Sequence, residues 1–132
     1  MVTKANNQLS KKAEITPKQL LKIPLILREA GSGTLDVIFN ALYNAGINPK
    51  DLHVEIQLES SIAIKQYLLY SETATFLSIQ SVISELKYNE LSIIDIKGLD
   101  IFRTFQFIQL HGKTSKLTEL FKRFCLSSHN LK

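Results

Sequence analysis

Apolar and polar positions follow two different periods along this chain, and the changes between them predict its strands and helices. Residues 24–27 form a short apolar run that is typical of a buried strand. Helical spacing follows until residues 44–46, whose asparagine and glycine are a stop signal for a helix. The apolar positions of this helix are Leu35, Ile38, Phe39, Leu42 and Ala45. Residues 28–34 between the two elements form a glycine-rich turn, in which we expect the Ser32 hydroxyl to cap the helix.

Further strands and helices alternate along the rest of the chain. Strict alternation over residues 53–58 predicts a strand with one buried face, and residues 75–77 and 91–96 predict shorter strands. Ser60 or Ser61 is expected to cap the helix that lies between the first two of these strands. Strands separated by helices favour an α/β fold with a mostly parallel sheet flanked by helices.

Two more helices are predicted from their starting residues. Residues 1–14 are expected to be a polar loop, after which Thr16 and Pro17 are typical of a helix opening. Ser78 is expected to begin a helix that carries Val82 and ends near Asn89. Both helices would flank the predicted sheet.

The C-terminal part combines a strand pattern with a helix pattern. Phe105 and Phe107 alternate with polar residues, and Ile108 and Leu110 then alternate in the opposite phase. This one-residue slip predicts a strand with a bulge, or one that passes between two packing environments. After it, Ser115 is expected to cap a final helix that ends near Leu126. The apolar face of this helix would be Leu117, Leu120, Phe121 and Phe124.

Composition indicates one globular domain with no membrane partner. The chain has 132 residues, of which 45% are hydrophobic and 21% charged, and no apolar run is long enough to span a bilayer. Its single cysteine, Cys125, cannot form an internal disulfide, which suits the cytoplasm. The net charge is +4, but the basic residues are scattered, so the pattern favours attraction of small anions over nucleic-acid binding.

The glycine-rich turn is the one candidate binding site. A helix start offers unpaired N–H groups and the positive end of the helix dipole, so Ser32, Gly33 and Thr34 are expected to receive an anion. Catalytic patterns are not found: Ala30 stands where a nucleophile elbow needs its first glycine, and no Walker lysine follows the turn. We therefore expect no enzyme activity and no cofactor.

No metal site is expected either. The three histidines, His53, His111 and His129, are far apart in the sequence, and none has a partner at ligand spacing.

Residues in order from 9 to 126 resemble the effector-binding region of LysR-type transcriptional regulators. That region has the two-lobed fold of type II periplasmic binding proteins. The matching residues are Leu9, Ser10, Lys11 and Lys12; Ile15, Thr16 and Leu20; residues 24–34; Glu59, Ser60, Ala63, Ile64 and Lys65; Leu77, Ser78, Val82, Glu85, Leu86 and Leu91; and Gly98, Leu99, Ile101, Arg103 and Phe105.

The resemblance implies that this chain is a C-terminal fragment of such a domain. Residues 1–110 would be the regulatory lobe II, and residues 111–132 would be the return hinge and a C-terminal helix that belongs to the missing lobe I. A small, anionic effector would bind between the lobes, at Ser32, Gly33, Thr34 and Ser60. The protein would form homo-oligomers and would bind DNA only through a winged helix-turn-helix domain that this chain lacks.

Two positions depart from the family's pattern. Leu35 stands where members commonly carry an arginine after the glycine-rich turn, and residues 71–73 replace a Gly-x-Gly. Two alternative functions stay open at this point: a lobe of a solute-binding protein for transport, which would carry a secretion signal, and a small α/β enzyme.

Overall fold

The computed structural model describes residues 1–104, 106–112 and 115–128. Internal contacts divide the chain into two compact units, unit 1 from Met1 to Phe102 and unit 2 from Arg103 to Lys132. Each unit is described by itself.

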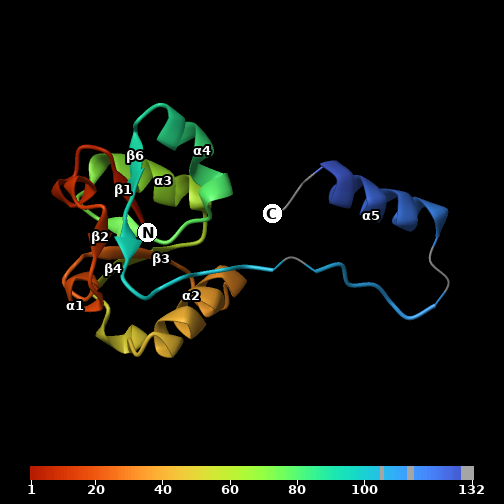
Figure 1. The fold of residues 1–132 in the computed structure, drawn as a ribbon, viewed down its shortest axis with the longest axis horizontal. Coiled ribbons are helices and arrows are strands. Elements are labelled where there is room, and N and C mark those ends of the chain that lie inside the picture. The colour runs from red at the N-terminus through yellow and green to blue at the C-terminus, as the bar shows by residue number, and fades with distance from the viewer. Residues whose placement is uncertain (105, 113–114, 129–132) are drawn as a thin grey trace. The chain divides into compact units, whose positions relative to one another are not determined.

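Unit 1 is built on a five-stranded sheet with the order β4-β3-β5-β1-β6 (Figure 1). The strands are β1 (Val2–Lys4), β3 (Leu25–Arg28), β4 (Val54–Leu58), β5 (Ala74–Thr75) and β6 (Leu91–Ile93). Strand β3 pairs in parallel with both β4 and β5, whereas β1 runs antiparallel to its neighbours β5 and β6. The predicted α/β fold with a mostly parallel sheet is confirmed.

Two apolar clusters cover the two faces of this sheet, because alternate residues of β3 point to opposite faces. Leu25 and Leu27 pack with helix α2 (Gly33–Asn44), and Ile26 packs with helices α3 (Ser61–Tyr70) and α4 (Ile79–Lys87). Figure 1 shows α2 and the α3–α4 pair on opposite sides of the sheet. Burying each large aliphatic side chain in these clusters contributes about 1.5–3 kcal/mol, so both faces stabilise the unit.

Smaller elements complete unit 1. Strands β2 (Glu14–Ile15) and β7 (Asp95–Ile96) form a parallel pair, and short 3₁₀ helices cover Gln8–Lys11 and Pro49–Asp51. Helix α1 (Pro17–Leu20) begins at Thr16, which forms a reciprocal capping box with Gln19. The helix opening that the sequence predicts at Thr16 and Pro17 is confirmed.

Two predictions for unit 1 are wrong. Residues 1–14 are not simply a loop, because β1 lies between β5 and β6, with Val2 and Thr3 fully buried. The single strand expected over residues 91–96 is divided into β6 and β7, because Ile94 turns into the core and separates the two pairings.

Unit 2 contains helix α5 (Lys116–Ser128). The Ser115 hydroxyl accepts a hydrogen bond from the Thr118 N–H at 3.1 Å, so the predicted cap is confirmed. The strand expected before it is wrong for the described residues, since 101–104 and 106–110 form no ladder pairs and are largely exposed. Phe105 lies outside the described residues. Without a partner strand, the alternating pattern and its phase slip produce no strand or bulge.

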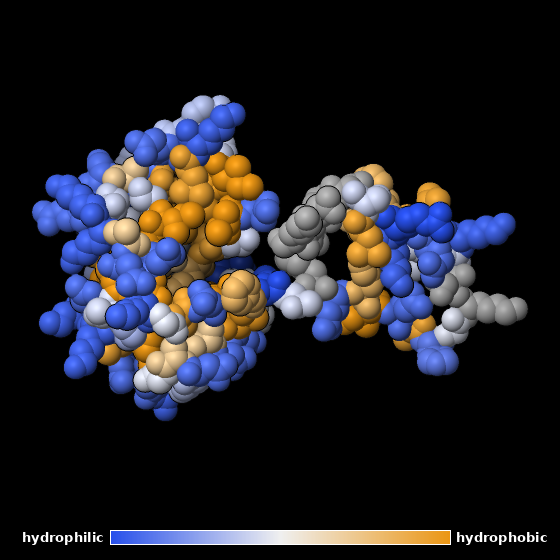
Figure 2. Space-filling model, viewed as in Figure 1, coloured by the Kyte–Doolittle hydropathy of each residue, from blue (hydrophilic) through white to orange (hydrophobic). Residues whose placement is uncertain are grey.

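Apolar side chains remain on the surface of both units (Figure 2). In unit 1 they include Ile62 near the start of α3, Ile79 at the start of α4 and Ile83 in the middle of α4. In α5 they include Leu117, Leu120, Phe121 and Phe124, which are at least 60% exposed. The predicted apolar positions of α5 are therefore helical but not buried.

Candidate functional site

The candidate site lies where the three parallel strands of unit 1 end. Strands β4, β3 and β5 are neighbours in the sheet, and a turn followed by a helix comes after each of them. The residues that precede these helices are all serines: Ser32 before α2, Ser60 before α3 and Ser78 before α4. Because parallel strands share one direction, these three helix starts lie along the same edge of the sheet.

Two of these helices leave the sheet on opposite faces. Helix α2 follows β3 and packs on the face that contains Leu25 and Leu27, whereas α3 follows β4 and packs on the face that contains Ile26. Neighbouring parallel strands whose helices leave in opposite directions form a topological switch point, and ligands of α/β proteins bind in the crevice outside it. Helix α4, which follows β5 on the other side of β3, also packs on the face that contains Ile26, so the direction of the connections reverses at β3. We use the name switch point below for the adjoining ends of β3 and β4.

Register brings the predicted residues of both turns to this point. Arg28, the last residue of β3, pairs with Leu58, the last residue of β4. Ser32 and Gly33 follow the first of these strand ends, and Ser60 follows the second. Residues that are far apart in sequence therefore face one another across the switch point.

Ser32 occupies the predicted N-cap position of α2 but does not cap the helix with its hydroxyl. Its backbone is extended, its carbonyl accepts the N–H of Asp36 at 3.1 Å, and its side chain makes no capping hydrogen bond. The prediction of a hydroxyl cap is wrong. The turn closes through the backbone instead, because the N–H of Ser32 donates to the carbonyl of Glu29 at 3.2 Å.

The two glycines of the turn differ in what they provide. Gly31 has a φ of +86°, a left-handed conformation that other residues rarely adopt, so this position favours glycine. Gly33 is the first residue of α2, and a Cβ atom there would meet nothing within 4 Å. The space in the Cβ direction of Gly33 is thus unoccupied.

Ser60 caps α3 as expected. Its hydroxyl accepts a hydrogen bond from the Ala63 N–H at 3.4 Å, which decides between the two alternatives, Ser60 and Ser61. The cap uses one of the four N–H groups that a helix start leaves without a helical partner. The start of α3 therefore keeps the donors and the positive dipole end that favour an anion.

Arg28 is the cation at the switch point. Its Nε and Nη2 atoms donate to the two carboxylate oxygens of Glu29 at 2.7 and 2.9 Å, and Nη1 makes a long contact of 3.4 Å with the Ser61 hydroxyl. The hydrogen bond that Arg28 donates to Glu29 raises the pKa of Arg28, and the same bond lowers the pKa of the Glu29 carboxyl. A nearby Glu59 adds a second negative charge to this environment.

Arg28 and Glu29 are not among the site residues that the sequence predicts. A signal was present, because Arg28 is a charged residue directly after the apolar run 24–27. The Arg28 side chain is therefore expected at the end of a strand. Only the register of β3 with β4 shows that this strand end adjoins the start of α3.

Both departures from the family's pattern have a structural consequence. Leu35 is only 4% exposed and packs into the α2 face of the core, so it presents no charge at the site. In residues 71–73, which replace the family's Gly-x-Gly, the hydroxyls of Ser71 and Thr73 lie 2.6 Å apart. The Thr73 carbonyl accepts a hydrogen bond from the Thr3 hydroxyl at 2.8 Å. The segment is held by hydrogen bonds rather than left conformationally free.

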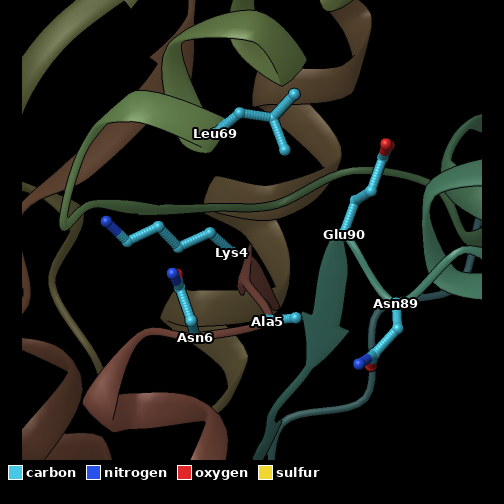
Figure 3. A pocket seen from close by; sticks show the side chains of 6 residues that line it. All are labelled: Lys4, Ala5, Asn6, Leu69, Asn89 and Glu90. Atoms are coloured by element: carbon cyan, nitrogen blue, oxygen red, sulfur yellow. The ribbon is translucent and has the colours of Figure 1, made fainter.

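A separate pocket of about 350 Å³ lies at the other end of the strands from the three helix starts (Figure 3). It is lined by Lys4, Ala5, Asn6, Leu69, Asn89 and Glu90. Here β1 ends and β6 begins, and the N–H of Ala5 donates to the carbonyl of Glu90 at 2.9 Å. Ligand pockets are mostly apolar, whereas four of the six residues that line this pocket are polar or charged, and none of the predicted site residues contributes to it. We therefore place the candidate site at the switch point.

Within the part of the chain that the structure describes, no group of three histidine, cysteine or acidic side chains could hold a metal ion. His129, one of the three histidines, lies outside that part. None of the helices in the described ranges is long and apolar enough to cross a membrane.

Comparison with known proteins identifies the fold. The chain is similar to the regulatory domain of CcmR from Synechocystis PCC6803, solved in complex with 2-PG, with a TM-score of 0.76 and 22% identity. The match covers 98% of this chain and 62% of that one. At this level of identity the likeness shows a common fold, that of a LysR regulatory domain of the type II periplasmic-binding kind.

Several sequence relatives are named as transcriptional regulators. The chain is 27% identical to the RuBisCO operon transcriptional regulator of Acidithiobacillus ferrooxidans over 97% of this chain and 41% of the relative. It is 31% identical to the transcriptional regulator CbbR of Rhodospirillum rubrum over 67% of this chain and 28% of the relative. The chain thus spans less than half of the length of these relatives. The family model of the LysR substrate binding domain matches residues 1–130, and this chain belongs to that family.

Proposed function

We propose that this chain is part of the effector-sensing domain of a LysR-type transcriptional regulator. Its effector would be a small anion that binds at the switch point between β3 and β4. The observation that carries the proposal is that register brings the starts of α2 and α3 to the adjoining ends of two neighbouring strands. Two helix starts together supply N–H donors and positive dipole ends to a negative group.

Specific residues of this chain take roles in the proposal. Ser32, Gly33 and Thr34 would offer the start of α2, and Ser60 would offer the start of α3. Residues 1–110 would form lobe II, and residues 111–132 would form the return hinge and a helix of lobe I. The contacts divide the chain after Phe102, and the assignment of the parts to lobes is a proposal.

A phosphorylated acid is the effector class that we propose. The related CcmR regulatory domain was solved with 2-PG, 2-phosphoglycolate, which carries a carboxylate and a phosphate. Two anionic groups match two adjacent helix starts with a cation between them. In this proposal the effector controls DNA binding by a winged helix-turn-helix domain outside this chain, in the cytoplasm, and the chain catalyses no reaction. Regulation is favoured over transport because the named relatives are transcriptional regulators.

The proposal is tested by adding a negative charge at the start of α2. In Gly33→Asp the new Cβ atom meets no atom within 4 Å, and a carboxylate at a helix start is favourable for the helix dipole, so we expect the fold to be kept. Titration with 2-phosphoglycolate and inorganic phosphate, followed by amide NMR, should show shifts at residues 32–34 and 60–63 in the parent and their loss in the variant.

Asn40→Asp is the matched control, because Asn40 lies on the exposed face of α2 away from the helix start. It adds the same charge to the same helix and should leave the titration unchanged. Equal binding by the parent and Gly33→Asp would contradict the proposed site.

A further inference from the structure

The Arg28–Glu29 ion pair is placed where the proposed effector would bind. Arg28 ends β3 and Glu29 begins the turn to α2, while the guanidinium reaches toward Ser61 at the start of α3. Their side chains are 22% and 32% exposed, so the pair is open to small solutes and to water. The pair is therefore part of the surface at the switch point and not of the core.

Glu29 holds Arg28 in the way that a bound carboxylate would. Both carboxylate oxygens accept a hydrogen bond, one from Nε at 2.7 Å and the other from Nη2 at 2.9 Å. This two-point geometry is the one in which arginine recognises carboxylate and phosphate groups. Glu29 thus occupies the side of the Arg28 guanidinium that would otherwise bind an anion. Among the described residues, Arg28 is the only cation assigned to the switch point.

The guanidinium still has donors to offer. It carries five N–H groups, of which two are given to Glu29 and one to Ser61. Among the residues that the structure describes, no partner is found for the other two. An anion can therefore approach Arg28 before the contact with Glu29 is broken.

Charge explains why such an approach would be opposed. Arg28 contributes one positive charge, and Glu29 and Glu59 contribute one negative charge each, so these three side chains sum to −1. The buried Leu35 adds no compensating cation. As long as Glu29 remains hydrogen-bonded to Arg28, a doubly charged anion is repelled by the Glu29 carboxylate instead of being attracted by an unpaired cation.

We propose that Glu29 competes with the anionic group of the effector for Arg28 and thereby sets the effector concentration at which the site fills. This inference rests on the proposed function, because it assumes that the effector binds at the switch point. Binding of the effector transfers the Arg28 hydrogen bonds from the Glu29 carboxylate to the incoming carboxylate or phosphate. Glu29 is in this sense a specificity-determining residue that favours ligands with enough charge to displace it.

The test compares Glu29→Gln with the parent chain. Glutamine keeps the size of the side chain but binds a guanidinium without charge assistance, so the displacement becomes easier. Titration with inorganic phosphate and with 2-phosphoglycolate, followed by the Arg28 Nε–H resonance, should show tighter binding by Glu29→Gln. The expected gain is about two- to fivefold, which corresponds to loss of one partly exposed ion pair.

The carboxyl resonance of Glu29 in the parent gives a second readout. If phosphate takes Arg28 from Glu29, the pKa of Glu29 should rise toward its ordinary value as phosphate is added. A merely structural role for Glu29 would leave this pKa unchanged by phosphate.

Glu59→Gln is the matched control, because it removes the same charge near Arg28 without removing one of the hydrogen bonds given above. Its gain should be under about twofold, since solvent and salt screen an exposed charge. Equal gains in the two variants, or a Glu29 pKa that phosphate does not change, would overturn the competition and leave the proposed site standing. No binding of either probe by any variant would overturn the competition and the anion site together.

Discussion

Helices α2 and α5 show how the same sequence pattern leads to two different outcomes. Each helix carries large apolar residues at helical spacing and is preceded by a serine. In α2 the residues of this face are buried, and Leu42 is 0% exposed, whereas Leu120 of α5 is 65% exposed. The pattern therefore determines which residues share a face, but not what covers that face.

The difference follows from what each unit contains. Unit 1 has a sheet whose two faces need cover, and its helices bury their apolar residues there. The described part of unit 2 has one helix and no sheet. A helix of this length needs a packing surface, because in water its own hydrogen bonds barely offset the entropy of ordering it. The four predictions below test which side chains stabilise each unit.

The largest effect is expected from a cavity in unit 1. Ile26 is 0% exposed and packs against Ile64 and Leu68, so Ile26→Ala should lower the free energy of unfolding by about 4 kcal/mol. Leu120→Ala is the control and should change this free energy by less than about 0.5 kcal/mol. Urea unfolding followed by circular dichroism gives both values, and equal losses would show that α5 belongs to the cooperative unit.

The second prediction concerns the face of α5. We expect two copies of the chain to associate through this face, because burying each aromatic or leucine side chain is worth about 1.5–3 kcal/mol. Phe121→Ala should weaken the association by about 2 kcal/mol, and truncation after Gly112 should abolish it. Lys122→Ala, a neighbouring polar position, should have no effect.

Light scattering over a range of concentrations measures this association. A parent chain that is monomeric throughout, with α5 flexible in solution, would contradict the prediction. The same measurement on Ile26→Ala should show unchanged association if the two units act independently.

The third prediction compares the caps of the two units. Thr16 and Gln19 form a capping box in unit 1, with the Thr16 N–H donating to Gln19 Oε1 at 2.8 Å. Thr16→Ala should therefore cost about 1 kcal/mol in the unfolding of unit 1. Ser115→Ala removes the cap of α5 and should reduce the helical carbon chemical shifts of α5 alone. A loss of unit 1 stability in Ser115→Ala would contradict independence of the units.

Local signals in the sequence predicted much of the fold. Ser60 and Ser78 precede α3 and α4 as expected, because the residue at a helix start and the apolar spacing after it are both local signals, although only Ser60 caps its helix with its side chain. Strand β1 was missed because it has three residues, and its burial depends on distant partners such as Thr73, whose carbonyl accepts the Thr3 hydroxyl. The alternation in residues 104 and 106–110, which the structure describes, gave no strand for the converse reason, since a strand also needs a neighbour to pair with.

The candidate site was less predictable than the fold. The glycine-rich turn and Ser60 were found separately from local patterns, but only the register of β3 with β4 brings them together. Arg28 escaped notice because its place beside the start of α3 is again a consequence of that register. Whether Ser32, Gly33, Thr34 and Ser60 bind an effector stays a prediction.

The smallest effect is expected from the ion pair that links α3 to α4 in unit 1. Lys65 Nζ lies 2.6 Å from Glu85 Oε1, and the hydrogen bond from Lys65 holds the pKa of Glu85 below its ordinary value of 4.5. Because the folded state favours the ionised form, the stabilisation is present above this value and is lost as the pH falls through the lower pKa of the folded state.

Lys65→Met should remove this contribution, which is under about 1 kcal/mol for a pair near the surface. Lys87→Met, an exposed lysine of the same helix as Glu85, serves as the control. The difference between the two variants in the free energy of urea unfolding should be largest at neutral pH. It should vanish in acid, because protonated Glu85 forms no ion pair with Lys65. A difference that persists below the folded pKa would show that Lys65 stabilises unit 1 by packing and by its 3.2 Å bond to the Ser81 carbonyl instead.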